Sequence, residues 1–270
     1  MAVRVSEVDL LLQSQRDWAV RRGIALDVGG DRFTERRDAL MTGALLPETE
    51  AELDQGAGKE LKRIHQLRSS TCLAVNVFEP WRNEPSPLGP ALDLEFAPVT
   101  VAFEARQPTG LGGTAPHLDV LLGGRGPTVG LECKFLEMYE PANNTFAESY
   151  FETDGLWSHI PRCRELAARI TGGEESFRYL AAAQLLKHAL GLSVNHTDSF
   201  RLLLVWYRVD GTTAEAIDAE IERFSSAIDD IRFRAITYQD LVSSLRANPD
   251  PVSGYFDYLA DRYQLGQAGE

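Results

Sequence analysis

Two short stretches of the chain place ionisable side chains inside runs that otherwise have the pattern of apolar strands. They are HLDVLL, which carries Asp119, and VGLECK, which carries Glu132 and Lys134. The segment between them, residues 123–128 (GGRGPT), has the composition of a turn. Because burying a charge in a sheet is costly unless a partner compensates it, the chemistry of these side chains depends on what they face.

The turn fixes the register of the predicted hairpin, because the last residue before it faces the first residue after it. Counting back along both strands places Asp119 opposite Glu132 and His117 opposite Lys134, all four on one face. The other face is predicted to be apolar and to form part of the core. It carries Leu118, Val120, Leu122, Val129, Leu131, Cys133 and Phe135.

The pair of facing carboxylates indicates a metal site. Residues that face each other across a hairpin have Cβ atoms about 4.5–5.5 Å apart, so two like charges there repel. A divalent cation turns that repulsion into attraction, and Mg²⁺ prefers a few carboxylate oxygens together with water and phosphate. Lys134 lies beside such an ion, where it either polarises or deprotonates an attacking water or neutralises a phosphate. The pattern predicts metal-assisted hydrolysis of a phosphodiester.

The elements that position these residues follow from hydrophobic periodicity. Helices are predicted over residues 5–22, 59–78, 161–170, 176–190 and 213–228, with one or two short helices after Gln239. Besides the hairpin, strands are predicted over residues 98–105, 199–210 and 231–238. This order predicts an α/β fold with a mixed central β-sheet flanked by helices. We expect a single domain over residues 1–270, in which residues 1–58 form an N-terminal helical and loop extension and residues 59–210 the catalytic core.

Composition narrows the class of protein. The chain has 270 residues and a net charge of −13, which argues against a protein that coats nucleic acid through its overall field. It leaves room for a local basic groove or a bound divalent cation. No segment has the roughly 18 unbroken apolar residues of a membrane span, and the three cysteines lack metal-ligand spacing. We expect a cytoplasmic protein with reduced thiols and no membrane contact.

The segments HLDV and LECK resemble the D…(D/E)-x-K signature of the PD-(D/E)XK nuclease superfamily. Four further stretches are similar to a bacterial restriction-endonuclease-like group within it, so that the resemblance covers about residues 60–210. They are SSTCLAVNVFEPW, VAFEA, GLECKFLEMYEP and YLAAAQLLKHAL. One departure is Leu118, which stands where the name of the motif has proline.

The resemblance implies a restriction-endonuclease-like core and assigns roles to residues. Asp119 and Glu132 are then metal ligands, Glu104 is a further ligand directly or through water, and Lys134 assists the nucleophile. Gln184 is a supporting catalytic residue on the following helix. The implied activity is Mg²⁺-dependent endonucleolytic cleavage of DNA, with Mn²⁺ as a substitute and a role in defence against foreign DNA.

Two alternatives remain open from the sequence. The first alternative to a DNA endonuclease is a catalytically inactive module on the same fold, which binds nucleic acid or protein. The second is a nuclease that acts on RNA or another phosphoester. A homodimer is compatible with the sequence, which carries no signal for or against one.

Other polar residues are weaker candidates. His117 either tunes Lys134 and touches phosphate or is incidental at the start of its strand. Lys187 and His188 share a helical face with Gln184, and we expect both to lie on a solvated surface. The remaining candidates for substrate contact are Ser69, Ser70, Tyr139 and Glu140.

Overall fold

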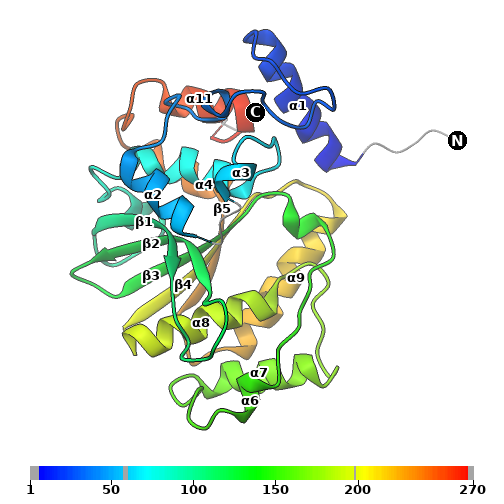
Figure 1. Ribbon diagram of the computed structural model, residues 1–270, viewed down its shortest axis with the longest axis vertical. Coiled ribbons are helices and arrows are strands. Elements are labelled where there is room, and N and C mark those ends of the chain that lie inside the picture. The colour runs from blue at the N-terminus through cyan, green and yellow to red at the C-terminus, as the bar shows by residue number, and fades with distance from the viewer. Residues whose placement is uncertain (1–5, 57–59, 198, 267–270) are drawn as a thin grey trace, which may run out of the picture.

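The computed structural model describes residues 6–56, 60–197 and 199–266 and has a mixed β-sheet at its centre (Figure 1). The described residues form one sheet whose strands lie side by side in chain order: β1 (Pro98–Arg106), β2 (His117–Gly124), β3 (Thr128–Lys134), β4 (Phe200–Trp206) and β5 (Phe233–Thr237). The pairs β1–β2 and β2–β3 are antiparallel, and the pairs β3–β4 and β4–β5 are parallel. The predicted fold class is therefore confirmed.

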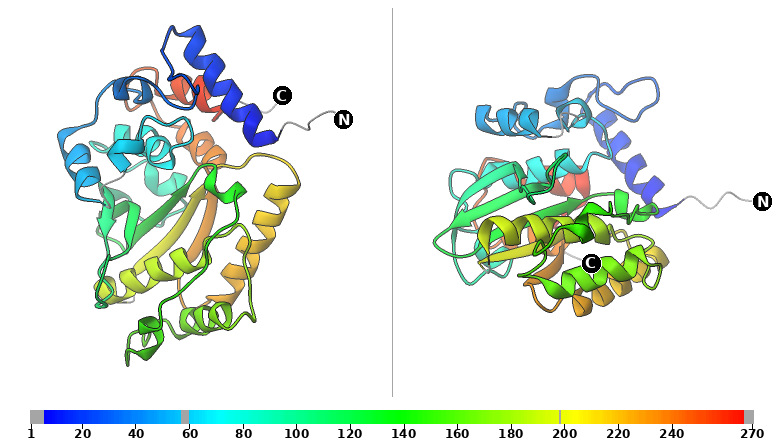
Figure 2. Two further views of the ribbon diagram at one scale, coloured as in Figure 1. Left: turned by 45° about the vertical axis from the view of Figure 1, so that its right-hand side comes forward. Right: turned by 60° about the horizontal axis from the view of Figure 1, so that its bottom comes forward.

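Helices cover both faces of the sheet, as the two views of Figure 2 show. One layer contains α1 (Glu7–Arg21), α2 (Pro47–Gln55), α3 (Glu60–Arg63), α4 (Ser70–Phe78), α5 (Leu88–Ala91), α10 (Tyr238–Leu245) and α11 (Tyr255–Tyr263). The other contains α6 (Ser149–Glu152), α7 (Pro161–Thr171), α8 (Ala182–His196) and α9 (Thr212–Ala227). Three short 3-10 helices are η1 (Arg36–Ala39), η2 (Glu79–Trp81) and η3 (Glu137–Tyr139).

The sheet divides the hydrophobic interior into two cores because its strands are buried on both faces. Along β4, Leu203 and Val205 pack into the core beneath α4 and α11, whereas Leu202 and Leu204 pack into the core beneath α8 and α9. The three cysteines are free thiols buried within these cores. None of the helices in the described ranges is long and apolar enough to cross a membrane.

Two predicted helices differ from the structure near the site. In place of a helix over residues 59–78, whose first residue lies outside the described residues, the chain forms α3 and α4. Gln66 makes a β-bridge to Arg32 between them, and Ser69 begins α4 by accepting a hydrogen bond from the Cys72 N–H. Long-range pairing and a helix cap therefore break an otherwise helical pattern.

The predicted helix over residues 176–190 begins later, at Ala182, and ends at His196. The Glu220 carboxylate accepts hydrogen bonds from the backbone N–H groups of residues 178–180, which holds that stretch outside the helix. The division into an extension over residues 1–58 and a core over residues 59–210 stays a prediction, because its boundary lies outside the described residues.

The hairpin has the predicted register close to its turn, where Leu122 pairs with Val129 and Val120 with Leu131. Beyond that last pair the β2–β3 ladder ends. The ladder contains neither the predicted pair Asp119–Glu132 nor the predicted pair His117–Lys134, so both predicted pairings are wrong. On the other edge of β2, His117 pairs with Arg106 of β1.

Leu118 also departs from the prediction, since it packs into the core beneath α8 and not with Val120 and Leu122. The strict alternation of faces is lost next to Asp119. On β1, the paired residues on either side place Glu104 opposite Asp119, and Glu104 has a left-handed backbone φ of 47°. This irregularity opens the sheet where the polar side chains lie.

Candidate active site

The pairing of β2 with β3 extends from the turn as far as Val120. The gap between the two strands begins at Asp119, the next residue of β2 away from the turn. The Asp119 carboxylate accepts a 2.6 Å hydrogen bond from the backbone N–H of Cys133 on the neighbouring strand. Burial raises the pKa of Asp119 well above its ordinary value, and the charge of Glu132 raises it further. The two predicted acids therefore interact, and they do so unfavourably.

Glu132 is 2 % exposed and has a positively charged or polar partner at each oxygen. Its Oε1 lies 2.6 Å from Lys134 Nζ, and its Oε2 lies 2.9 Å from His188 Nε2. Burial raises the pKa of Glu132, but Lys134 and His188 outweigh burial and lower this pKa to about 2. Glu132 is therefore ionised at neutral pH.

Lys134 bridges β3 and α8, because Nζ also donates a 3.0 Å hydrogen bond to Gln184 Oε1. Burial lowers the pKa of Lys134, but the charges of Glu132 and Asp119 prevail and raise it above its usual range. The ammonium keeps its proton in this arrangement. Of the two roles predicted for Lys134, the geometry favours neutralising charge over taking a proton from water.

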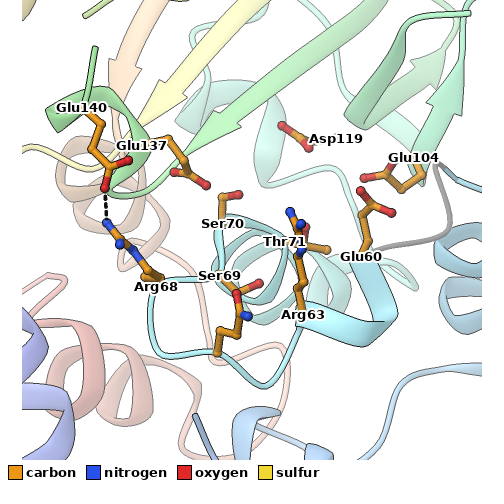
Figure 3. Close-up of a pocket in the computed structure, with 11 residues that line it drawn as sticks. Glu60, Arg63, Arg68, Ser69, Ser70, Thr71, Glu104, Asp119, Glu137 and Glu140 are labelled. Carbon is orange, nitrogen blue, oxygen red and sulfur yellow. Dashed lines mark hydrogen bonds and ion pairs between the residues drawn. The ribbon is translucent and has the colours of Figure 1, made fainter. Parts of the chain in front are cut away.

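Glu104 adds a third acid, which lies opposite Asp119 and next to Glu60 (Figure 3). Burial raises its pKa to about 7, with further contributions from the charges of Glu60 and Glu132. His117 Nδ1 is 3.8 Å from Glu104 Oε2. Gly56 follows α2 and makes room for this carboxylate, because a Cβ there would lie 2.9 Å from Glu104 Oε2.

The donor set fits a hard divalent cation in chemical type. Asp119, Glu104 and Glu132 supply carboxylate oxygens, and the pKa values of Asp119 and Glu104 are raised, first by burial and then by neighbouring negative charge that a cation would offset. No group of three His, Cys, Asp or Glu side chains in the described ranges is arranged as a finished metal site. Each oxygen of Glu132 makes one contact, with Lys134 or with His188, and an ionised carboxylate oxygen has a second lone pair that remains for a cation.

Two cavities, each of about 360 Å³, meet at Glu60, Glu104 and Asp119. The α4 cavity is further lined by Arg63, Gln66, Arg68, Ser69, Ser70, Thr71, Glu137 and Glu140, most of which Figure 3 labels. The α8 cavity is further lined by Thr114, Ala115, Pro116, His117, Tyr150, Gln184, Lys187 and His188. The carboxylates thus lie between two separate spaces that a ligand can enter.

The weaker candidates from the sequence differ in where their side chains lie relative to the two cavities. Ser70 and Glu140 line the α4 cavity, where Glu140 makes a 2.6 Å ion pair with Arg68. Ser69 lines it too, but its hydroxyl is the cap of α4. Tyr139 instead donates to the Tyr207 carbonyl outside both linings.

Sequence reasoning missed several residues of the site, among them His188, Glu60 and Tyr150. His188 was expected on a solvated surface, and that expectation is wrong: it is 2 % exposed and faces Glu132 from α8. Its signal was the spacing of four residues from Gln184, which places both on one helical face. Glu60 gave no signal, because only the packing of α3 brings it to Glu104.

Comparison with known proteins gives a family for this chain. A family described as restriction endonuclease associating with ARP matches residues 18–264. The chain belongs to this family. Membership in the restriction endonuclease associating with ARP family confirms the restriction-endonuclease-like resemblance and connects the chain to nuclease function. Searches among curated proteins and among solved structures gave no match.

Proposed function

We propose that this chain is a metal-dependent endonuclease that hydrolyses DNA phosphodiester bonds. The observation that carries the proposal is the junction of the two cavities, where Asp119 and Glu104 lie beside the buried Glu132–Lys134 pair. Membership in a restriction endonuclease family supports nuclease chemistry at this junction and DNA as its substrate.

Each residue has a role that follows from its contacts. Asp119, Glu132 and Glu104 would hold the cation, for which we propose Mg²⁺ with Mn²⁺ as a substitute. When bound, such an ion supplies a Lewis acid and lowers the pKa of a coordinated water. The Lys134 ammonium neutralises charge that develops on the phosphoryl oxygens, and Gln184 holds that ammonium in place.

The biological setting is part of the proposal. The family description names association with ARP, and we extend to this chain both that association and a role in defence against foreign DNA. We keep the predicted cytoplasmic location, which the free, buried cysteines support.

The first test is plasmid cleavage with Mg²⁺ or Mn²⁺ by the unmodified chain and by Lys134→Ala. We expect nicking or linearisation by the unmodified chain and a loss of at least about 100-fold in the variant. Arg164→Ala is a matched control, because Arg164 is an exposed cation on α7 that lines neither cavity. Equal cleavage by Lys134→Ala would refute the proposed role of Lys134.

A second test measures Mn²⁺ binding by calorimetry and does not depend on activity. Asp119→Asn is expected to abolish binding, whereas Asp154→Asn, which changes an exposed aspartate, is expected to leave it intact. DNA, RNA and small phosphoesters supplied side by side identify the substrate class. An unmodified chain that binds neither ion and cleaves none of them would instead be a non-catalytic module.

A further inference from the structure

The two cavities that meet at the carboxylates differ in the chemistry of their walls. The α4 cavity offers hydroxyl groups such as that of Thr71, guanidinium groups such as that of Arg63, and carboxylates such as that of Glu137 (Figure 3). The α8 cavity offers an aromatic ring, that of Tyr150, together with Pro116, Lys187 and Gln184. A nucleotide chain that crosses the carboxylates therefore has charged and hydroxyl side chains on one side. On the other side it has one aromatic side chain and a few polar groups.

The Tyr150 ring is held in place by other aromatic rings. It lies edge-on to Phe146, with ring centroids 5.6 Å apart, and 6.4 Å from the ring of Trp157. The Trp157 indole N–H donates a 2.7 Å hydrogen bond to the Tyr150 carbonyl, which fixes the backbone beneath the ring. Because these contacts order a half-buried side chain before any ligand arrives, stacking on it costs little conformational entropy.

Lys187 and Gln184 place polar groups beside this ring. Lys187 Nζ lies 5.5 Å from the Tyr150 ring centroid and donates a 2.9 Å hydrogen bond to the Thr145 carbonyl. Partial burial of Lys187 lowers its pKa. Gln184 uses its amide oxygen on Lys134, so the NH₂ end of the amide is the end left to turn toward a ligand.

We propose that the α8 cavity is a nucleotide subsite in which the base next to the scissile phosphate stacks on Tyr150. The proposal deepens the proposed function and rests on it for the position of that phosphate at the carboxylates. Every base has a π-face, so stacking on one ring tolerates any sequence, while Lys187 provides a cation for a backbone phosphate. A base enters the cavity only when it is unpaired or turned out of the duplex.

The test begins with binding of a fluorescent single-stranded octadeoxynucleotide by the full chain in EDTA, measured by anisotropy. Tyr150→Leu keeps apolar volume but removes the flat ring, and it is expected to weaken binding about 5- to 100-fold. Tyr150→Phe is expected to stay within about twofold of the unmodified chain because stacking needs only the ring. Tyr179→Leu is the matched control, since Tyr179 is also half-buried with a cation over its ring but lines neither cavity.

A second measurement changes the ligand instead of the protein. Octanucleotides that lack one base at successive positions are expected to show one position where base loss weakens binding. That loss should be present with the unmodified chain and absent with Tyr150→Leu, because only the stacked base senses the ring. The melting temperature of each variant and its tryptophan fluorescence, to which Trp157 is one of four contributors, show whether the protein remains folded.

The possible results of these experiments test the nucleotide subsite and the nuclease activity separately. Absence of binding by the unmodified chain, or equal binding by folded Tyr150→Leu and Tyr179→Leu, would overturn the subsite. The subsite would also be overturned if loss of the same base weakened binding equally in the unmodified chain and in Tyr150→Leu. Ring-dependent binding without cleavage in Mg²⁺ or Mn²⁺ would support the subsite and refute the nuclease.

Discussion

Two of the places where the described residues bury charge differ in how that charge is compensated. Arg262 on α11 is fully buried, and its guanidinium donates hydrogen bonds to the Ala39 carbonyl and the Tyr258 hydroxyl. Four aromatic rings surround it, with centroids 4.5–5.8 Å from Cζ: those of Trp18, Phe33, Tyr258 and Tyr263. This centre buries one charge, and neutral groups compensate it, some from α11 itself and some from the first 40 residues of the chain.

At the junction of the two cavities, several charges of one sign are gathered instead. Of Asp119, Glu104 and Glu132, Glu132 has a cationic or imidazole partner within ion-pair distance at each oxygen, whereas the pKa values of Asp119 and Glu104 are raised. The comparison teaches that a buried charge with neutral partners serves the fold. A group of mutually repelling carboxylates weakens the fold and is explained by a ligand that brings positive charge.

Among the substitutions that test this comparison, Asp119→Asn is expected to have the largest effect. Activity should fall about 1000-fold, because a carboxylate ligand is lost. The melting temperature of the EDTA-treated protein at pH 8 should rise, because asparagine can still accept the Cys133 N–H bond but does not repel Glu132. Plasmid cleavage and thermal unfolding measure the two effects, and a lower melting temperature would contradict the comparison.

Arg262→Ala should produce the opposite pattern. Losing a fully buried side chain and its hydrogen bonds is expected to lower the free energy of unfolding by about 3 kcal/mol. Urea titration measures this loss. The specific activity of the folded fraction should stay within about twofold of the unmodified chain, and a selective loss of activity at unchanged stability would contradict a purely structural role.

Substituting alanine for either of two glycines tests the same comparison, because each substitution adds a single methyl group. At Gly130 a Cβ would lie 2.6 Å from Leu118 and 2.9 Å from Leu192, so Gly130→Ala should lower the unfolding free energy by about 2 kcal/mol. At Gly56 a Cβ would lie 2.9 Å from Glu104 Oε2, 3.0 Å from its Cγ and 3.2 Å from its Cβ, so the added methyl group displaces this site carboxylate and not a core side chain. Gly56→Ala should therefore reduce activity with little change in urea unfolding, and equal stability losses would remove the distinction.

The smallest expected effect is a pH dependence due to Glu104. Its pKa in the folded protein is about 7, against an ordinary 4.5, so the folded state binds more protons than the unfolded state between these values. Stability of the metal-free protein therefore falls as pH rises through this window. Glu104→Gln removes the dependence, and its melting temperature relative to the unmodified chain should increase from pH 5 to pH 8. A constant difference would show that Glu104 titrates normally.

The sequence predicts what local rules control. The turn at residues 123–128 sets the hairpin register near Val120 because side chains alternate strictly along a strand. It does not predict the end of the ladder at Asp119, since that depends on a third strand and on the left-handed φ of Glu104. Periodicity along α8 likewise places Gln184 and His188 together without showing which face meets the sheet, and only tertiary packing decides that.

The contacts between α1 and α11 have a consequence for how the protein is made. Arg21 and Asp261, 240 residues apart, are joined by a 3.1 Å ion pair, and Gln264 donates to the Ser14 hydroxyl. A ribosome that adds about 5–20 residues per second needs about 12–48 s to cover that interval. Trp18 lacks its Arg262 partner until then. The nascent chain therefore completes the layer above α4 only once α11 has been synthesised, and chaperone contact before that point should concentrate on α1.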